Sequence, residues 1–64
     1  MRKFEVGNQY KGVKFGDVIT ITERTRGMLI YKDNEGRFGN SVVLRDKKGN
    51  EKANIFNNMD IINA

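Results

Sequence analysis

Acid–base or nucleophilic chemistry in this 64-residue chain would have to come from carboxylates, hydroxyls and amines, because the sequence contains no histidine and no cysteine. Ser41 and the threonines therefore lack the imidazole that activates a hydroxyl in a catalytic triad. Thiolate nucleophiles, disulfide bonds and the usual structural zinc sites are excluded in the same way. The acids Asp17, Asp33, Glu35 and Asp46 lie beside glycine or in turn-like segments, where acidic residues are common for backbone reasons. We therefore expect a protein that is not an enzyme and that uses no metal or cofactor.

The segment Gly12-Val13-Lys14-Phe15-Gly16-Asp17 has the glycine content of a phosphate-binding loop. A P-loop requires a Lys-Ser/Thr pair after its last glycine, followed by a helix whose N-terminus faces the phosphates. Here an aspartate follows the last glycine, and the residues after it alternate as a strand does. The segment is therefore interpreted as an ordinary loop.

Basic residues beside aromatic residues are the one pattern that indicates a ligand. β-Surfaces bind single-stranded nucleic acid by combining a positive groove with exposed rings. The six aromatic residues are few for a core, so we expect only Phe15 and Phe38, each next to a glycine, to be free for contact. The candidate nucleic-acid-binding residues are Lys11, Lys14, Phe15, Arg24, Arg26, Lys32, Arg37 and Phe38. The alternative is that these cations form a solvated or protein-contacting face that protects strand edges from pairing.

The elements that must position these residues are short strands. Glycine, asparagine and aspartate recur too often for a helix of ordinary length, and the segments between them have a period of two. The clearest example is Asp17 to Glu23, in which Ile19 and Ile21 share one face. The predicted strands span residues 3–10, 17–23, 28–32, 41–46 and 51–56, with turns at 33–36 and 47–50.

Five or six short antiparallel strands in one 64-residue domain predict an all-β fold, and the chain is too short for two full sheets. We expect a small SH3-like barrel, with an OB-like barrel as the alternative, although no helix between the third and fourth strands is visible. The predicted core consists of Phe4, Val6, Ile19, Ile21, Leu29, Tyr31, Val42, Leu44 and Ile55. The apolar tail from Ile55 to Ile62 is either a helical turn or a sixth strand, and we expect it to pack across the open end of the barrel.

The charge balance favours anionic partners. Twelve Lys and Arg residues outweigh eight Asp and Glu residues, which gives a net charge of +4. Residues 1–32 hold seven basic and three acidic side chains, whereas residues 33–64 hold five of each, so the excess lies in the first half of the sequence. No stretch is long and apolar enough to span a bilayer, and no signal peptide is indicated, so we expect a cytoplasmic protein that does not enter a membrane.

Two resemblances can be stated. One rests on the residues Phe4-x-Val6-Gly7-x-x-Tyr10, Asp17-x-Ile19-x-Ile21-x-x-Arg24-Thr25 and Gly49-Asn50-Glu51. This pattern resembles small uncharacterised β-proteins of phages and mobile elements of Gram-positive bacteria, and it implies a phage-type accessory protein without catalytic residues. The other, Gly16-Asp17-x-Ile19-x-Ile21 followed by Gly27-x-Leu29, is similar to the opening of KOW-type SH3-like modules. The segment between those strands, 22–26, lacks the glycine- and lysine-rich loop of that family, so the similarity bears on fold.

The function expected from these observations is a non-enzymatic binding module that contacts nucleic acid or a nucleoprotein through a basic face. Two alternatives stay open. One is a protein-binding inhibitor or anti-defence factor that acts on a host enzyme. The other is a self-associating structural protein, whose mass in solution would be at least twice the 7.4 kDa of one chain.

Overall fold

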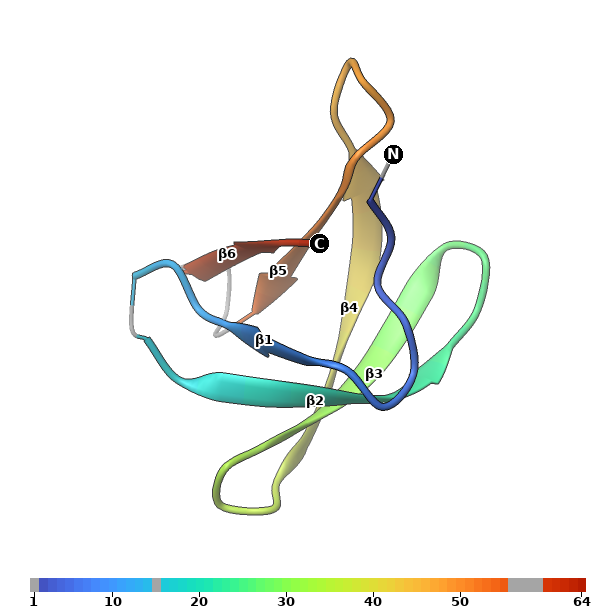
Figure 1. Ribbon diagram of the computed structural model, residues 1–64. Coiled ribbons are helices and arrows are strands. Elements are labelled where there is room, and N and C mark those ends of the chain that lie inside the picture. Colours follow the sequence, from blue (N-terminus) through green and yellow to red (C-terminus); the bar gives the residue numbers. More distant parts are fainter. Residues whose placement is uncertain (1, 15, 56–59) are drawn as a thin grey trace.

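The computed structural model describes residues 2–14, 16–55 and 60–64. One antiparallel sheet of six strands follows the sequence order, and each strand pairs with the next. The strands are β1 (Gln9–Lys11), β2 (Val18–Arg24), β3 (Met28–Asp33), β4 (Phe38–Arg45), β5 (Glu51–Ile55) and β6 (Asp60–Asn63). The sheet curls until its edge strands, β1 and β6, contact each other (Figure 1). Residues 34–37 turn directly from β3 into β4, where an OB-like barrel would have a helix. The predicted small antiparallel β-barrel is therefore confirmed.

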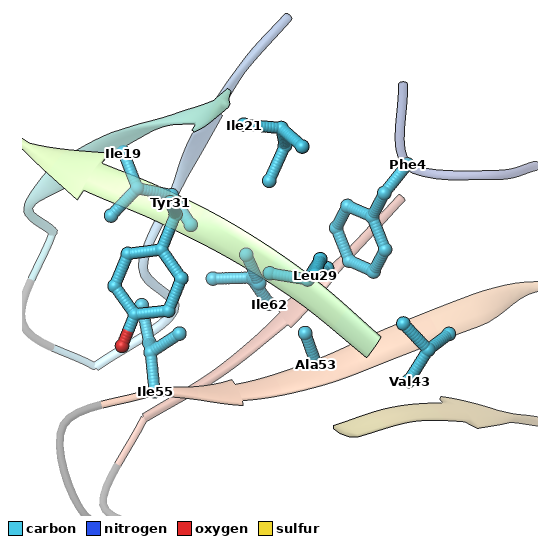
Figure 2. Packing of buried hydrophobic residues seen from close by; sticks show 9 residues of the cluster. All are labelled: Phe4, Ile19, Ile21, Leu29, Tyr31, Val43, Ala53, Ile55 and Ile62. Atoms are coloured by element: carbon cyan, nitrogen blue, oxygen red, sulfur yellow. The ribbon is translucent and has the colours of Figure 1, made fainter. Parts of the chain in front are cut away.

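The core is a single cluster of apolar side chains inside the curl of the sheet. Its buried members are Phe4, Ile19, Ile21, Leu29, Tyr31, Val43, Ala53, Ile55 and Ile62. These side chains come from five of the six strands and from the N-terminal segment, and they converge on one interior (Figure 2). The ring of Phe4 packs edge-on against the half-buried ring of Tyr10, with 4.8 Å between centroids. Six of the nine predicted core residues are thus correct.

The predicted phase of the fourth strand was wrong. Val42 and Leu44 are 58% and 50% exposed, whereas Ser41 and Val43 are buried. The register explains this, because Ser41 lies opposite the core residue Leu29 and Val42 lies opposite the exposed Met28. Residues directly opposite each other in a ladder share a face, so the hairpin turn decides which apolar side chains of β4 enter the core.

The predicted first strand, residues 3–10, was also wrong in extent. A turn interrupts it: Gly7 adopts a φ of 90°, and the Asn8 N–H donates to the Glu5 carbonyl. Val6 is in this turn and is 59% exposed, while Phe4 on its other side stays buried. The regular strand, β1, consequently begins only at Gln9.

The ambiguous C-terminal segment ends in a strand, β6. Ile62 is buried and packs in the core, which confirms the expectation that the tail packs, whereas Ile61 is 46% exposed. Phe56 and Met59, which belonged to the predicted tail, lie outside the described residues.

A buried carboxylate, Glu51 at the start of β5, is the main polar feature of the interior. Its Oε1 accepts a hydrogen bond from the Phe4 N–H (2.9 Å). Its Oε2 accepts one from Arg24 Nη2 (2.6 Å) and one from Arg45 Nη2 (3.1 Å). Burial alone would raise the pKa of Glu51, but the hydrogen bonds from Arg24 and Phe4 and the positive charges of both arginines outweigh it, so the pKa lies below its usual value.

The main chain at Glu51 joins further segments. Its N–H donates to the Arg2 carbonyl (3.1 Å), and its carbonyl accepts from the Ala64 N–H (3.0 Å). One residue therefore connects the N-terminal segment, β2, β4 and the C-terminal end of the chain.

The seam between the two edge strands is closed by a second buried acid. Asp60 is 1% exposed and accepts a hydrogen bond from the Lys14 N–H (2.6 Å). A Cβ on Gly12 would collide with the Asp60 carboxylate, so only glycine allows this close approach.

We expect the Glu51→Gln substitution to destabilise the barrel by about 3–5 kcal/mol, because it removes one partner of a buried ion pair and leaves the other charge uncompensated. A domain of this size has little more stability than that to lose, so Glu51→Gln should abolish most of the cooperative unfolding transition in far-UV circular dichroism at neutral pH. Glu35→Gln, at an exposed acid in the β3–β4 turn, is the control and should change the urea midpoint little. Equal midpoints for the two variants would contradict this role.

The same interaction predicts acid sensitivity. Because the folded-state pKa of Glu51 is lowered, the folded protein binds fewer protons than the unfolded chain. The stabilisation is complete above the ordinary value of 4.5 and is lost as the pH falls through the folded-state pKa. Carboxyl carbon NMR of the wild type should show Glu51 titrating below 4.5, and a higher value would rule out this account.

Gly39 is expected to be irreplaceable for a steric reason. A Cβ at this position would lie 2.5 Å from Tyr31 Cζ and 2.6 Å from its hydroxyl oxygen, inside the core. Gly39→Ala should therefore cost about 1–3 kcal/mol by overpacking. Gly27→Ala is the matched control, because nothing lies within 4 Å of the added methyl group. Urea denaturation should show a lower midpoint for the first variant only; a normal midpoint for Gly39→Ala would contradict the packing.

Candidate nucleic-acid interface

The β3–β4 hairpin brings together three of the predicted binding residues: Lys32, Arg37 and Phe38. The Asp33 N–H donates to the Arg37 carbonyl (2.9 Å), and Asp33 Oδ1 accepts from the N–H groups of Glu35 and Arg37. Gly36 supplies the positive φ of 84° that the turn requires. The expectation that acids such as Asp33 serve the backbone of turns is thus confirmed, and the hairpin has a fixed shape.

Phe38 lies on the outer face of this hairpin. Its side chain is 67% exposed, and its cross-strand neighbour Lys32 places Nζ 5.8 Å from the ring centroid. The next residue, Gly39, faces inward against the Tyr31 ring, so the alternation of the strand turns Phe38 outward. The interaction of Lys32 with the ring face holds a positive charge beside an exposed aromatic surface.

Two open grooves flank this ring, and Phe38, Gly39 and Asn40 line both of them. The larger one, of about 800 Å³, runs along β4 toward Leu44 and reaches Asn54 on β5. It follows the part of β4 that pairs only with β3, since β5 pairs with β4 only from Val43 to Arg45. The smaller groove lies on the other side, against Thr22 and Ile30. The ring therefore stands as a ridge between two shallow channels that carry amide and hydroxyl groups.

The charge at the tip of the hairpin is balanced. Arg37 Nε is 3.1 Å from Asp33 Oδ2, and Arg37 Nη2 is 3.2 Å from Glu35 Oε2. The backbone N–H of Arg37 is the main reason why the pKa of Asp33 is lower than usual, with further hydrogen bonds to Glu35 and Arg37 acting the same way. Arg37 is 72% exposed and can reach a ligand, but it adds little net positive charge here.

Arg24 does not lie on the surface with the other predicted residues. A β-bulge between Ile21 and Glu23 shifts the register of β2, so that Arg24 pairs with the core residue Leu29 and points inward to Glu51. Its side chain is only 16% exposed. Its guanidinium is committed to the fold and presents little surface to a ligand.

The remaining predicted residues are spread over other parts of the molecule. Arg26 is exposed in the β2–β3 turn, and its carbonyl accepts from Arg45 Nη2 (3.4 Å). Lys11 and Lys14 are exposed on β1 and in the β1–β2 loop. Phe15 lies outside the described residues. Among the predicted residues that the structure describes, only Lys32, Arg37 and Phe38 of the β3–β4 hairpin are thus brought together.

Sequence reasoning missed the two buried acids, Glu51 and Asp60. The sequence indicates both. Each acid precedes an apolar core residue by two positions and therefore shares its face of the strand: Glu51 precedes Ala53, and Asp60 precedes Ile62.

No group of three or more acidic side chains suitable for a metal ion occurs in the described ranges 2–14, 16–55 and 60–64. Over the same ranges, none of the elements is a helix of the length and apolar character needed to cross a membrane.

Comparison of the chain with protein-family models, with curated proteins and with solved structures gives no match. The expected kinship with phage proteins therefore stays a prediction, and function must be argued from the surface of this barrel alone.

Proposed function

We propose that the protein is a non-enzymatic module that binds single-stranded nucleic acid across the outer face of the β3–β4 hairpin. The observation that carries the proposal is the exposed ring of Phe38, which has the Lys32 ammonium beside it and a groove on either side. An aromatic ring kept in solvent contributes nothing to this core, and its exposure supports a role in contact with a ligand.

The mechanism would combine two effects. A base stacked on Phe38 contributes about 1–3 kcal/mol whatever its identity, because every base has a π-face. Lys32 would contact a neighbouring phosphate, and the release of counterions would make binding weaker as salt rises. Asn40, which lines both grooves, offers an amide to base edges. Such a site favours single strands with little sequence preference.

A protein partner is the second candidate, and a specific observation favours it. Val42 and Leu44 continue the outer face of β4 beyond Phe38 and are each at least half exposed. Apolar side chains in a row are typical of protein contacts. Val42→Thr with Leu44→Gln would separate the two: loss of a protein complex with unchanged oligonucleotide affinity would favour the protein partner.

We expect Phe38→Ala to weaken binding of a fluorescein-labelled single-stranded oligonucleotide about 5- to 150-fold at low salt, as measured by anisotropy. The fold should survive, because the ring is mostly exposed. Phe38→Trp should retain affinity, since it keeps a stacking surface. Val13→Ala is the control: Val13 is 68% exposed, lies in the β1–β2 loop and lines neither groove beside Phe38.

Two results would overturn the proposal. One is the absence of any affinity of the wild type for single- or double-stranded DNA or RNA at low salt. The other is equal affinity of Phe38→Ala and the wild type for every oligonucleotide tested.

A further inference from the structure

The net charge of the barrel is concentrated at one end. We define the hairpin end as the N-terminal segment, the β2–β3 turn and the β4–β5 hairpin; the β3–β4 hairpin with Phe38 belongs to the opposite end. These segments lie together because Arg2 binds Asn50 and Arg45 binds Arg26. In Figure 1 the N-terminal segment, described from residue 2 on, runs beside the β4–β5 hairpin at the top of the view. The basic side chains of this end are Arg2, Lys3, Arg24, Arg26, Arg45, Lys47, Lys48 and Lys52, and the acidic ones are Glu5, Glu23, Asp46 and Glu51. These residues account for the whole net charge of +4.

The opposite end is neutral. Its four cations, Lys11, Lys14, Lys32 and Arg37, are matched by four acids, Asp17, Asp33, Glu35 and Asp60. A polyanion approaching the molecule is therefore attracted to the hairpin end, even though the exposed ring of Phe38 is at the other end of β4.

Two of the four acids of the hairpin end, Glu51 and Asp46, are engaged in the fold, whereas Glu5 and Glu23 are exposed. Glu51 is buried and faces Arg24 and Arg45. Asp46 Oδ1 accepts hydrogen bonds from the N–H groups of Lys48 and Asn50 within the β4–β5 turn. Five cations of this end are exposed and are in no ion pair within the part of the chain that the structure describes: Arg2, Lys3, Arg26, Lys47 and Lys48.

At this end the side chain of Arg45 is fixed by two hydrogen bonds. Its Nη2 donates to Glu51 Oε2 (3.1 Å) and to the Arg26 carbonyl (3.4 Å), while the side chain is 47% exposed. A guanidinium fixed in this way loses less conformational entropy when its remaining N–H groups bind a phosphate.

We propose that the hairpin end is the phosphate-binding part of the same nucleic-acid site, so that the strand follows β4 from the end that holds Arg45 to the outward-facing Phe38. This inference rests on the proposed function. The two residues are seven positions apart on one strand, which is roughly 24 Å at the usual rise. That span corresponds to about seven nucleotides at 3.4 Å per stacked nucleotide. The hairpin end supplies most of the charge contacts, and the other end supplies the stacking contact of Phe38 and the phosphate contact of Lys32.

The test compares two double variants with the same loss of charge: Lys47→Gln/Lys48→Gln at the hairpin end and Lys11→Gln/Lys14→Gln at the opposite end. The measurement is the slope of log affinity against log salt for a twelve-nucleotide single strand, by anisotropy. Two lost phosphate contacts should reduce the slope of the first variant by about 1.4. The second variant should keep the slope of the wild type.

The length of the oligonucleotide gives an independent reading. A strand of four nucleotides cannot reach from Phe38 to Arg45, so its slope should be shallower than that of strands of eight or twelve nucleotides. An equal slope at all three lengths would contradict the arrangement along β4.

The outcomes separate this inference from the proposed function. If Phe38→Ala weakens binding but Lys47→Gln/Lys48→Gln keeps the full slope, the hairpin end is not the phosphate site and the proposed function stands. If the salt slope depends on Lys47 and Lys48 while Phe38→Ala binds normally, the stacking site and the track along β4 are both wrong. If Phe38→Ala lowers affinity with an unchanged slope and the lysine variant loses slope, both hold.

Discussion

The barrel depends on a carboxylate that stays ionised although it is buried. A charge can be buried only where opposite charges and hydrogen bonds replace its water, and Glu51 receives both from Arg24, Arg45 and the Phe4 N–H. Its main-chain groups also bind Arg2 and Ala64. In a small domain without cysteine, this cluster joins the N-terminal segment, β2, β4 and the C-terminal end of the chain. It also fixes the position of Arg45, whose partly exposed side chain connects the buried carboxylate with the surface at which a ligand would bind.

The sequence alone predicted the strands that alternate cleanly and failed where the alternation is degenerate. Ile19 and Ile21 are separated by threonine, so only one phase is consistent with a buried face. In Val42-Val43-Leu44, three apolar residues follow one another and both phases are equally apolar, so the register of the β3–β4 turn decides between them. The inward direction of Arg24 was not predicted for a related reason. The β-bulge before Glu23 reverses the phase within one strand, and no residue type marks this bulge.

The candidate site shows the same division between local and long-range information. Lys32 and Phe38 were both expected to contact a ligand, and they lie opposite each other because a short turn joins their strands. Charge counted along the sequence placed the excess in residues 1–32, but antiparallel strands return the chain to the same end at every second turn. The β2–β3 and β4–β5 turns therefore share an end although about twenty residues separate them, and their cations combine there. No count over halves of the sequence can show this.

Arg45 raises the question of whether binding a phosphate would compete with its hydrogen bond to Glu51. Both fixed hydrogen bonds of Arg45 come from Nη2, and its Nε and Nη1 donate to no acceptor within the part of the chain that the structure describes. A guanidinium has five N–H donors in a rigid fork, so a phosphate can bind the free edge while Glu51 keeps the other. The ligand then favours the state in which the arginine is already fixed, which is the folded barrel. Because anything that binds only the folded state stabilises it, occupancy of the hairpin end would reinforce the Glu51 cluster and not compete with it.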